Sequence, residues 1–157
     1  MKSLSVRRLT FAALIAAVYA ALTMALGFIS YGPVQFRIAE ALCILPFFMP
    51  FTTWGLFVGC ILANLVTGCA PWDVVFGSLA TLIGAAGTYL LRKKPLLAWI
   101  PPVLSNAIIV PIVLQRVYGV PDSFWYLMLT VGAGEVIACG ILGLLLYKAL
   151  QKVPNLF

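Results

Sequence analysis

The sequence predicts an all-α integral membrane protein with six transmembrane helices and both termini on the cytoplasmic side. Three observations predict this class. The 157-residue chain is 64% hydrophobic and has a mean hydropathy of +1.12, which is too much apolar surface for a water-soluble core. Charged residues make up only 9% of the chain, against about 25% in ordinary soluble domains. Eight of the ten Lys and Arg residues fall in three clusters that hydrophobic hairpins separate.

The basic clusters also predict the orientation. Positive residues next to membrane helices collect on the cytoplasmic side, so an even number of spans is expected between each pair of clusters. The other two basic residues, Arg37 and Arg116, then fall in outer connectors. We expect no nucleic-acid partner, because binding one would need the basic residues on a single folded face. The clusters are Lys2, Arg7 and Arg8, then Arg92, Lys93 and Lys94, and finally Lys148 and Lys152.

The length of the chain limits it to one membrane domain, residues 1–157. A span needs about 20 apolar residues, which leaves room for about six spans and no soluble domain. The first apolar segment is long enough to cross the membrane and does not resemble a cleaved signal peptide. Pro46 and Pro50 shorten the second span. The expected spans are residues 8–28, 38–51, 53–68, 74–91, 96–114 and 124–147.

Metal and haem sites are not expected. The chain contains no histidine, and its four cysteines include no C-x-x-C pair, so the usual zinc and haem ligand patterns are missing. The cysteines are most simply small apolar packing residues. We therefore expect no metal and no cofactor in this chain.

The acidic residues point to a pocket open to the outside. Glu40 is near the outer end of the second span, Asp73 begins the fourth, and Glu135 is roughly 16 Å deep in the sixth at 1.5 Å per residue. A carboxylate at that depth costs several kcal/mol unless it faces a wet cavity or a partner. The candidate substrate-binding residues are Glu40, Glu135, Asn64, Asp73, Trp72, Gln35, Arg37, Tyr31 and Asn106.

Purely structural roles stay open for most of these residues. The aromatic side chains fit an interfacial belt, and the two asparagines fit hydrogen bonds between helices. Asp73 could cap the fourth helix, and Arg37 could pair with Glu40, three residues later. Glu135 is the hardest to explain without a ligand or a wet cavity.

Small residues form a stripe along the first span. Two rows of alanine repeat every four residues, and such a flat stripe lets another helix approach closely. Because the stripe lies in the cytoplasmic half, away from the polar groups, it suits docking of a separate partner protein. Packing inside the same chain is the alternative. The rows are Ala12, Ala16 and Ala20, and beside them Ala13, Ala17 and Ala21.

Three classes of function compete. An intramembrane enzyme would need catalytic residues, but the chain has no G-x-S-x-G and no H-E-x-x-H. A secondary transporter usually shows two related halves, and no convincing repeat is present. A substrate-capture subunit needs only an outer pocket and an inner docking surface, while partner proteins supply the ATPase. That class fits best, since the chain has no nucleotide-binding G-x-x-x-x-G-K-[ST].

Three ordered motifs resemble the QueT family. Residues 32–42, followed by Leu45-Pro46, resemble its Q-F-R-x-[SA]-E-A-L signature, with Ala39 where Ser is usual. Residues 55–64 and 73–81 resemble its next two hallmarks. The resemblance implies a substrate-binding S component of an energy-coupling factor (ECF) transporter. It also implies a six-helix bundle in the bacterial plasma membrane, and a complex with one membrane scaffold protein and two ATPases. The alanine-rich first helix would meet the scaffold.

The resemblance further implies that the cargo is a queuosine precursor, a deazaguanine base. A carboxylate can accept the paired N–H donors of a guanine-like edge, a role that suits Glu40 or Glu135. Asp73 would lie nearer the entrance of the pocket. An aminomethyl form of the base would add a cation, which a second carboxylate or an aromatic face could hold.

The remaining candidates would complete that pocket. Asn64 and Gln35 would serve the carbonyl or a ring nitrogen, and Trp72 or Tyr31 would stack on the ring. We expect an outer loop, residues 27–35 or 69–72, to close over the base. Two alternatives stay open: an S component for another vitamin-like ligand such as a purine, pterin or flavin, and a stand-alone transporter coupled to protons through Glu135.

Overall fold

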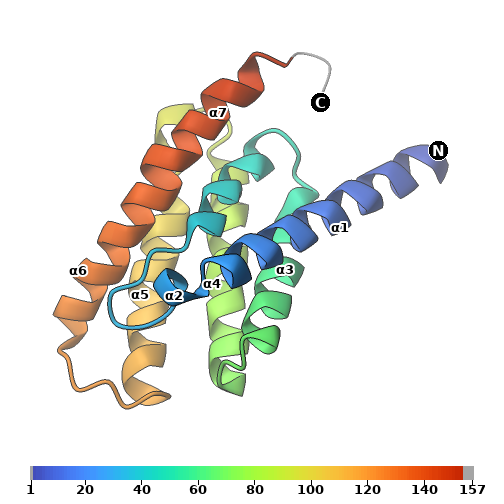
Figure 1. The fold of residues 1–157 in the computed structure, drawn as a ribbon. Helices are drawn as coiled ribbons and strands as arrows, with labels where there is room; N and C mark the ends of the chain where they lie inside the picture. The colour runs from blue at the N-terminus through green and yellow to red at the C-terminus, as the bar shows by residue number, and fades with distance from the viewer. Residues whose placement is uncertain (1, 154–157) are drawn as a thin grey trace.

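The protein is a helical bundle, as the sequence predicts. The computed structural model describes the backbone of residues 2–153 and the side chains of residues 6–153, so the side chain of Lys2 lies outside the described part. Throughout the described residues the regular structure is helical, without a strand. Figure 1 shows the helices gathered into one bundle, with α1 leaning across it.

Four stretches of the described chain are long and apolar enough to cross a membrane. They are α1 (Lys2–Ala25), α4 (Pro71–Leu90), α5 (Ile100–Arg116) with the preceding η2 (Pro95–Leu97), and the run of α6 (Phe124–Glu135), η3 (Val136–Leu142) and α7 (Gly143–Gln151). The other two expected spans are shorter apolar helices, η1 (Ile38–Phe47) and α3 (Thr52–Val66), and α2 (Gly27–Ser30) is a single turn after α1. The six expected segments therefore correspond to four long helices and two short ones.

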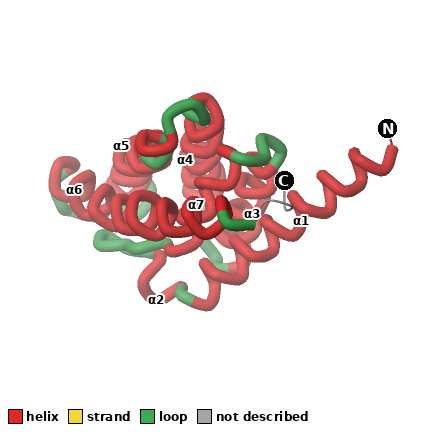
Figure 2. The backbone as a smooth tube through the Cα atoms, turned by 90° about the horizontal axis from the view of Figure 1, so that it is seen from above, coloured by secondary structure: helices red, strands yellow, loops and turns green. Residues whose placement is uncertain are grey.

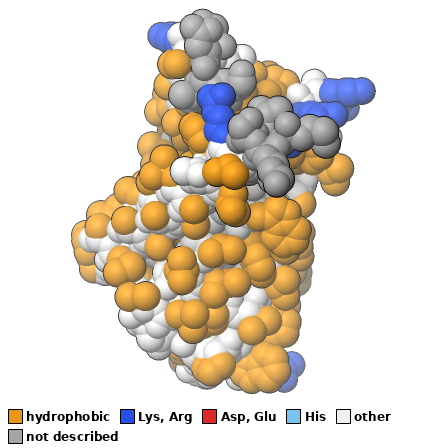
Figure 3. Space-filling view, turned by 90° about the vertical axis from the view of Figure 1, so that its right-hand side faces the viewer, with side chains coloured by type: hydrophobic (Ala, Val, Ile, Leu, Met, Phe, Trp, Pro, Cys, Tyr) orange, Lys and Arg blue, Asp and Glu red, His pale blue; other side chains and the backbone are white. Residues whose placement is uncertain are grey.

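The two ends of the bundle differ. The start of α1 and the end of α7 lie at one end, which we call the terminal end (Figure 1). Residues 67–70 and 117–123 lie at the opposite end, which we call the loop end. The view from above shows the first half of α1 projecting away from the other helices (Figure 2). On the face seen in Figure 3, hydrophobic side chains cover most of the surface, and the Lys and Arg side chains lie mainly at the terminal end.

The centre of the bundle is η1, a 3-10 helix of 10 residues. Such helices seldom exceed three or four residues, and their side chains at positions three apart share a face. The N-cap residue Arg37, Glu40 and Cys43 therefore lie on one face. Because η1 packs against α1, α3, α4, η3 and α7, these polar groups must find their partners inside the protein.

α1 and α3 pack closely because glycine on one helix faces alanine on the other. A Cβ atom on Gly55 would lie 2.5 Å from the backbone oxygen of Ala12, and one on Gly59 would lie 2.8 Å from that of Ala16. The two glycines form a G-x-x-x-G pair, which lets helices in a membrane approach to backbone contact. Part of the predicted docking stripe is therefore already covered by α3.

The two alanine rows consequently have different surroundings. Ala16 and Ala20 are only 5% and 9% exposed, whereas Ala13, Ala17 and Ala21 are exposed. The structure places the first row in internal packing and leaves only the second row free. This corrects the expectation that both rows face a partner, and the reason is the pair of glycines on α3.

Candidate ligand-binding site

A cavity of about 400 Å³ lies at the loop end of the bundle. The segment between α2 and η1, the α3–α4 loop, the first turns of α4, the end of α5 and the α5–α6 loop all contribute to its wall. Its volume is within the range of small-molecule pockets. The lining residues are Tyr31, Gly32, Pro33, Gln35, Arg37, Thr67, Gly68, Cys69, Asp73, Gly77, Val110, Val113, Leu114, Tyr118 and Val120.

Arg37 and Tyr31 form one polar wall of the cavity. The guanidinium carbon of Arg37 lies 5.1 Å from the centre of the Tyr31 ring, within range of a cation–π contact. Its Nη1 donates to the sulfur of Cys60 at 3.6 Å, and no ion pair with Glu40 is present among the described residues. The hydroxyl of Tyr31 donates to Oδ1 of Asn64 at 3.2 Å. Burial raises the pKa of Tyr31, so its phenol remains a donor near neutral pH.

Asp73 and Tyr118 form the opposite wall. The hydroxyl of Tyr118 donates to Oδ2 of Asp73 at 2.8 Å and accepts from the backbone N–H of Ala70 at 3.1 Å. Burial and the neighbouring carboxylate raise the pKa of Tyr118, so this bond persists through the physiological pH range. Asp73 thereby joins the first turn of α4 to the α5–α6 loop, and its Oδ1 is oriented towards Gly77.

Below the cavity, Glu40 is fully enclosed and accepts hydrogen bonds from three elements. Its Oε1 accepts from the hydroxyl of Tyr19 on α1 and from that of Thr81 on α4, the latter at 3.0 Å. Its Oε2 accepts from the thiol of Cys43 at 3.0 Å, which follows from the 3-10 geometry of η1. Glu40 therefore connects α1, η1 and α4.

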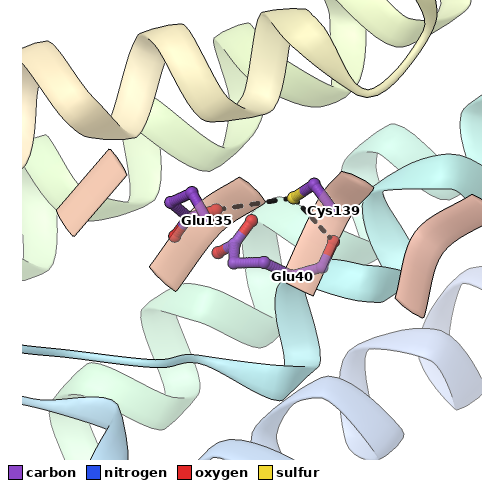
Figure 4. A group of neighbouring side chains, drawn as sticks. All are labelled: Glu40, Glu135 and Cys139. Atoms are coloured by element: carbon purple, nitrogen blue, oxygen red, sulfur yellow. Dashed lines mark hydrogen bonds between the residues drawn. The ribbon is translucent and has the colours of Figure 1, made fainter. Parts of the chain in front are cut away.

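Glu135 lies beside Glu40, and its neighbouring donors are the thiol of Cys139 and the amide of Asn106. One carboxylate oxygen of each residue and the sulfur of Cys139 lie within 4.8 Å of one another (Figure 4). The thiol of Cys139 reaches Oε2 of Glu135 at 3.4 Å and the backbone oxygen of Glu40 at 3.3 Å, and a single S–H can donate to only one of them at a time. The chain after Glu135 continues as the π-helix η3, a rare geometry that is frequent at functional sites.

Two buried polar atoms lack any hydrogen-bond partner among the described residues. They are the amide nitrogen Nδ2 of Asn106 and the hydroxyl oxygen of Ser78. Asn106 is 2% exposed, and its side chain neighbours the Glu135 carboxyl. An unpaired buried donor costs about 1–3 kcal/mol. The Glu135 carboxyl beside it is an acceptor within the chain that this amide can reach.

The acidic cluster has the residue types of a metal site but not the free ligand atoms. Both carboxylate oxygens of Glu40 accept hydrogen bonds from hydroxyl and thiol groups, and Glu135 is buried and is not part of the cavity lining. The thiol at the cavity wall is no better suited, because burial raises the pKa of Cys69 and the thiolate is the form that binds metal. The acid that faces the cavity, Asp73, suits an organic ligand that offers N–H donors.

Comparison with known proteins identifies the family. The sequence matches the family described as QueT transporter over residues 9–152, which is nearly the whole chain. The chain belongs to the QueT transporter family. A protein of Lactococcus lactis subsp. cremoris (strain MG1363), named Queuosine precursor transporter QueT, is 40% identical over 74 residues. That match covers 45% of this chain and 43% of the relative, so less than half of the relative's length is matched. A search of solved structures gave no match.

In this QueT-family chain the predicted binding residues lie at two depths, one level at the cavity wall and one buried beneath it. Four of them line the cavity: Tyr31, Gln35, Arg37 and Asp73. Four others are buried and are not part of the cavity lining: Glu40, Asn64, Asn106 and Glu135. The acids therefore do not share one open pocket with Asp73, as the sequence suggested. They form a closed level beneath it, because η1 places Glu40 in the centre of the bundle.

Trp72 lies outside both levels. Its side chain is 62% exposed, stacks on Phe76 at 5.9 Å between ring centres, and lines an apolar groove between α4 and α5. The neighbouring Asp73 lines the cavity, and residues adjacent along a helix do not share a face. Trp72 thus does not fill the stacking role expected of it, whereas Tyr31 is at the cavity.

Several residues of the site were not selected from the sequence. Thr81 had a detectable signal, because Asp73, Gly77 and Thr81 repeat at the four-residue spacing of one helix face. Tyr19 and Tyr118 had none, since their partners are 21 and 45 residues away along the chain.

Proposed function

We propose that this chain is the S component of an ECF importer, and that it binds a queuosine precursor, a deazaguanine base, from outside the cell. The observation that carries the proposal is the cavity at the loop end of a chain of the QueT transporter family. Its aromatic face at Tyr31, buried cation at Arg37 and carboxylate at Asp73 suit a flat base with polar edges. The name of the Lactococcus relative, a queuosine precursor transporter, supports the choice of cargo.

In this proposal the loop end faces outward and the terminal end faces the cytoplasm of a bacterial cell. The support is the distribution of charge. The basic residues 92–94 lie in the turn between α4 and η2, and Lys148 lies in the last turn of α7, at the terminal end. Positive residues collect at the cytoplasmic ends of membrane helices. The chain is then a multi-pass protein with both termini inside and its cavity outside.

The exposed alanine row on α1 is the proposed contact with the membrane scaffold protein. Ala13, Ala17 and Ala21 leave a flat strip on a helix that projects from the bundle (Figure 2), and small residues allow close packing of helices in a membrane. The first row cannot serve, because Ala16 and Ala20 are already buried. Two ATPases bound to the scaffold would supply the energy, and this chain would need no cofactor or catalytic step of its own.

The proposed transport cycle has three steps. The isolated subunit binds the base at the loop end, and segment 27–35 or 69–72 closes over it. The loaded subunit then docks on the scaffold through α1. Finally it reorients in the membrane as the partner ATPases hydrolyse ATP, and it releases the base inside.

Binding to the purified chain in detergent tests this proposal. Calorimetry would compare cyano-deazaguanine, aminomethyl-deazaguanine, queuine, guanine and riboflavin. We expect tight binding of at least one deazaguanine base. The cavity-filling substitution Val113→Phe should weaken it, whereas Ile112→Phe, on the next residue and 47% exposed, should not. A folded sample that binds riboflavin or guanine but no deazaguanine base would overturn the cargo and favour another S-component ligand.

A stand-alone transporter coupled to protons is the second candidate. The observation that favours it is the buried acid pair, since Glu40 and Glu135 bring carboxylate oxygens within 4.8 Å and such a pair could carry a proton. Accumulation of the base by this chain without ATPase partners would support this reading.

A further inference from the structure

The apolar groove that Trp72 lines runs between α4 and α5 and has a volume of about 770 Å³. Apart from Arg116, every side chain in its wall is aliphatic or aromatic. Several of these side chains are exposed, among them Phe76, Ile83 and Ile112. The groove is therefore open towards the surroundings of the bundle, and in a membrane those surroundings are lipid.

The way α4 and α5 cross explains why a groove forms. Nearer the terminal end the helices touch, since a Cβ atom on Gly84 would lie 2.6 Å from the Cα atom of Pro102. One on Gly87 would lie 2.4 Å from the Cβ atom of Pro101. Towards the loop end the apolar side chains of the groove are branched or aromatic, and they keep the helices from approaching as closely. The groove is thus a consequence of the sequence of both helices.

The length of the groove matches one leaflet of a bilayer. On α4 its wall extends from Trp72 to Ile83, a distance of about 16 Å at 1.5 Å per residue. The hydrocarbon core of a bilayer is about 30 Å thick, so one leaflet contributes about 15 Å. Trp72 lies in the first turn of α4, and tryptophan favours the level of the lipid headgroups. The groove therefore extends from the headgroup level to the middle of the bilayer.

The only charged side chain of the groove is available to an anion. Arg116 ends α5 at the loop end, and within the described residues it makes no hydrogen bond and no ion pair, including with Asp122 in the next loop. The amide of Gln115 instead donates to the backbone oxygen of Asp122 at 2.8 Å. A cation at the end of a helix suits the helix dipole, but that interaction leaves the N–H donors of the guanidinium free.

A phospholipid satisfies both the charge and the shape of this groove. A guanidinium can hold a phosphate group through two parallel hydrogen bonds. We propose that the α4–α5 groove binds one anionic phospholipid of the leaflet at the loop end, with its phosphate on Arg116 and one acyl chain along the groove. The indole N–H of Trp72, which has no acceptor among the described residues, donates to an ester oxygen of the lipid. The inference is independent of the cargo and of the ATPase partners.

A helix of another protein fits the groove less well than an acyl chain. Close packing of membrane helices uses small residues at the contact, and the wall of the groove contains no Gly, Ala, Ser or Thr. A flexible acyl chain can fill the irregular space between branched side chains. The proposed scaffold contact is also elsewhere, because α1 packs on α3 and η1 and lies across the bundle from α5 (Figure 2).

Photo-crosslinking of the full-length chain in lipid nanodiscs tests the inference. The discs contain phosphatidylcholine and a small share of phosphatidylglycerol with a diazirine in one acyl chain, and mass spectrometry locates the labelled residues. We expect the label to concentrate on the groove residues of α4 and α5. Arg116→Gln should lower groove labelling about fivefold, the effect of one basic residue at an anionic membrane surface. Lys93→Gln is the matched control, because it removes the same charge from an exposed position at the terminal end and should leave groove labelling unchanged.

A second pair of variants tests the place of the acyl chain. Ile112→Trp fills the groove and should displace the label, whereas Leu129→Trp, at a 68% exposed position of α6, should not. Label spread evenly over the helices of the wild type would overturn the inference, and this result needs no variant. Groove labelling that persists in folded Arg116→Gln protein would also overturn it, as would a dimer of this chain that covers the groove and excludes the probe. Binding of a deazaguanine base to the same discs tests the proposed function separately.

Discussion

At the scale of single residues, the candidate site depends on which hydrogen-bond donors reach two neighbouring glutamates. Glu40 accepts donors from α1, η1 and α4 and acts as a structural connection. Glu135 instead has the thiol of Cys139 and the amide of Asn106 beside it. A buried carboxylate is stable only when its oxygens are paired. The same residue type therefore has two roles a few ångströms apart.

Loss of one donor to Glu40 should destabilise the protein. Thr81→Val removes the hydrogen bond to Oε1 and keeps the shape of the side chain, so we expect a loss of about 1–3 kcal/mol in the free energy of unfolding. Thr10→Val is the control, because that exposed hydroxyl bonds only to its own helix and should change stability by less than about 0.5 kcal/mol. Denaturant unfolding in detergent measures both. Equal stability of the two variants would contradict the structural role of Glu40.

The sequence predicted the depth of both glutamates but not their division of roles. Depth follows from the position of each residue in an apolar segment. The roles depend on donors that are far away in the chain, such as Tyr19 and Thr81, 21 and 41 residues from Glu40. No local pattern reveals such partners. The contact of Asn106 with Glu135 is likewise a property of packing.

At the scale of helices, the short second segment explains most of the difference between expectation and structure. Pro46 and the short apolar stretch predicted that the second segment would be shorter than an ordinary membrane span. The geometry of η1, a buried 3-10 helix, was not predicted, because its conformation is determined by the five elements around it. The same holds for the π-helix after Glu135. The G-x-x-x-G pair on α3 was visible in the sequence and could have indicated internal packing of the first alanine row.

A methyl group at the α1–α3 contact should weaken the bundle. The Cβ atom of Gly55→Ala would lie 2.5 Å from a backbone oxygen of Ala12, whereas nothing lies within 4 Å of one on Gly27. Separating two packed helices typically costs about 1–3 kcal/mol. We therefore expect Gly55→Ala to lower the unfolding temperature and Gly27→Ala to leave it unchanged or slightly higher. A Gly55→Ala protein as stable as the wild type would show that α1 does not pack on α3 as described.

At the scale of the whole molecule, the two ends of the bundle and α1 differ in the residues they expose. In the proposed function the loop end would bind the ligand, the terminal end carries the basic residues, and the free face of α1 would meet the scaffold. The helical class follows from composition. The gathering of basic residues at one end of the bundle follows from the spacing of the charge clusters. The free face of α1 required the structure, because two identical alanine rows cannot be distinguished by sequence.

Substitutions on the two rows should have opposite effects. Ala17→Leu adds bulk on the exposed row, so we expect normal folding and ligand binding but little uptake in cells that contain the partner proteins. Ala16→Leu adds bulk where the side chain is 5% exposed and should lower stability by about 1–3 kcal/mol. Binding, thermal unfolding and cellular uptake of labelled base measure the three properties. Normal uptake by Ala17→Leu would argue against docking through this row.

The most direct test of the central claim is the fate of labelled deazaguanine base added to proteoliposomes that contain only this chain. A capture subunit without its partners should bind about one base for each outward-facing chain and accumulate none in the lumen, with or without a proton gradient. Accumulation in the lumen that depends on a proton gradient would contradict the account and identify the chain as a transporter in its own right.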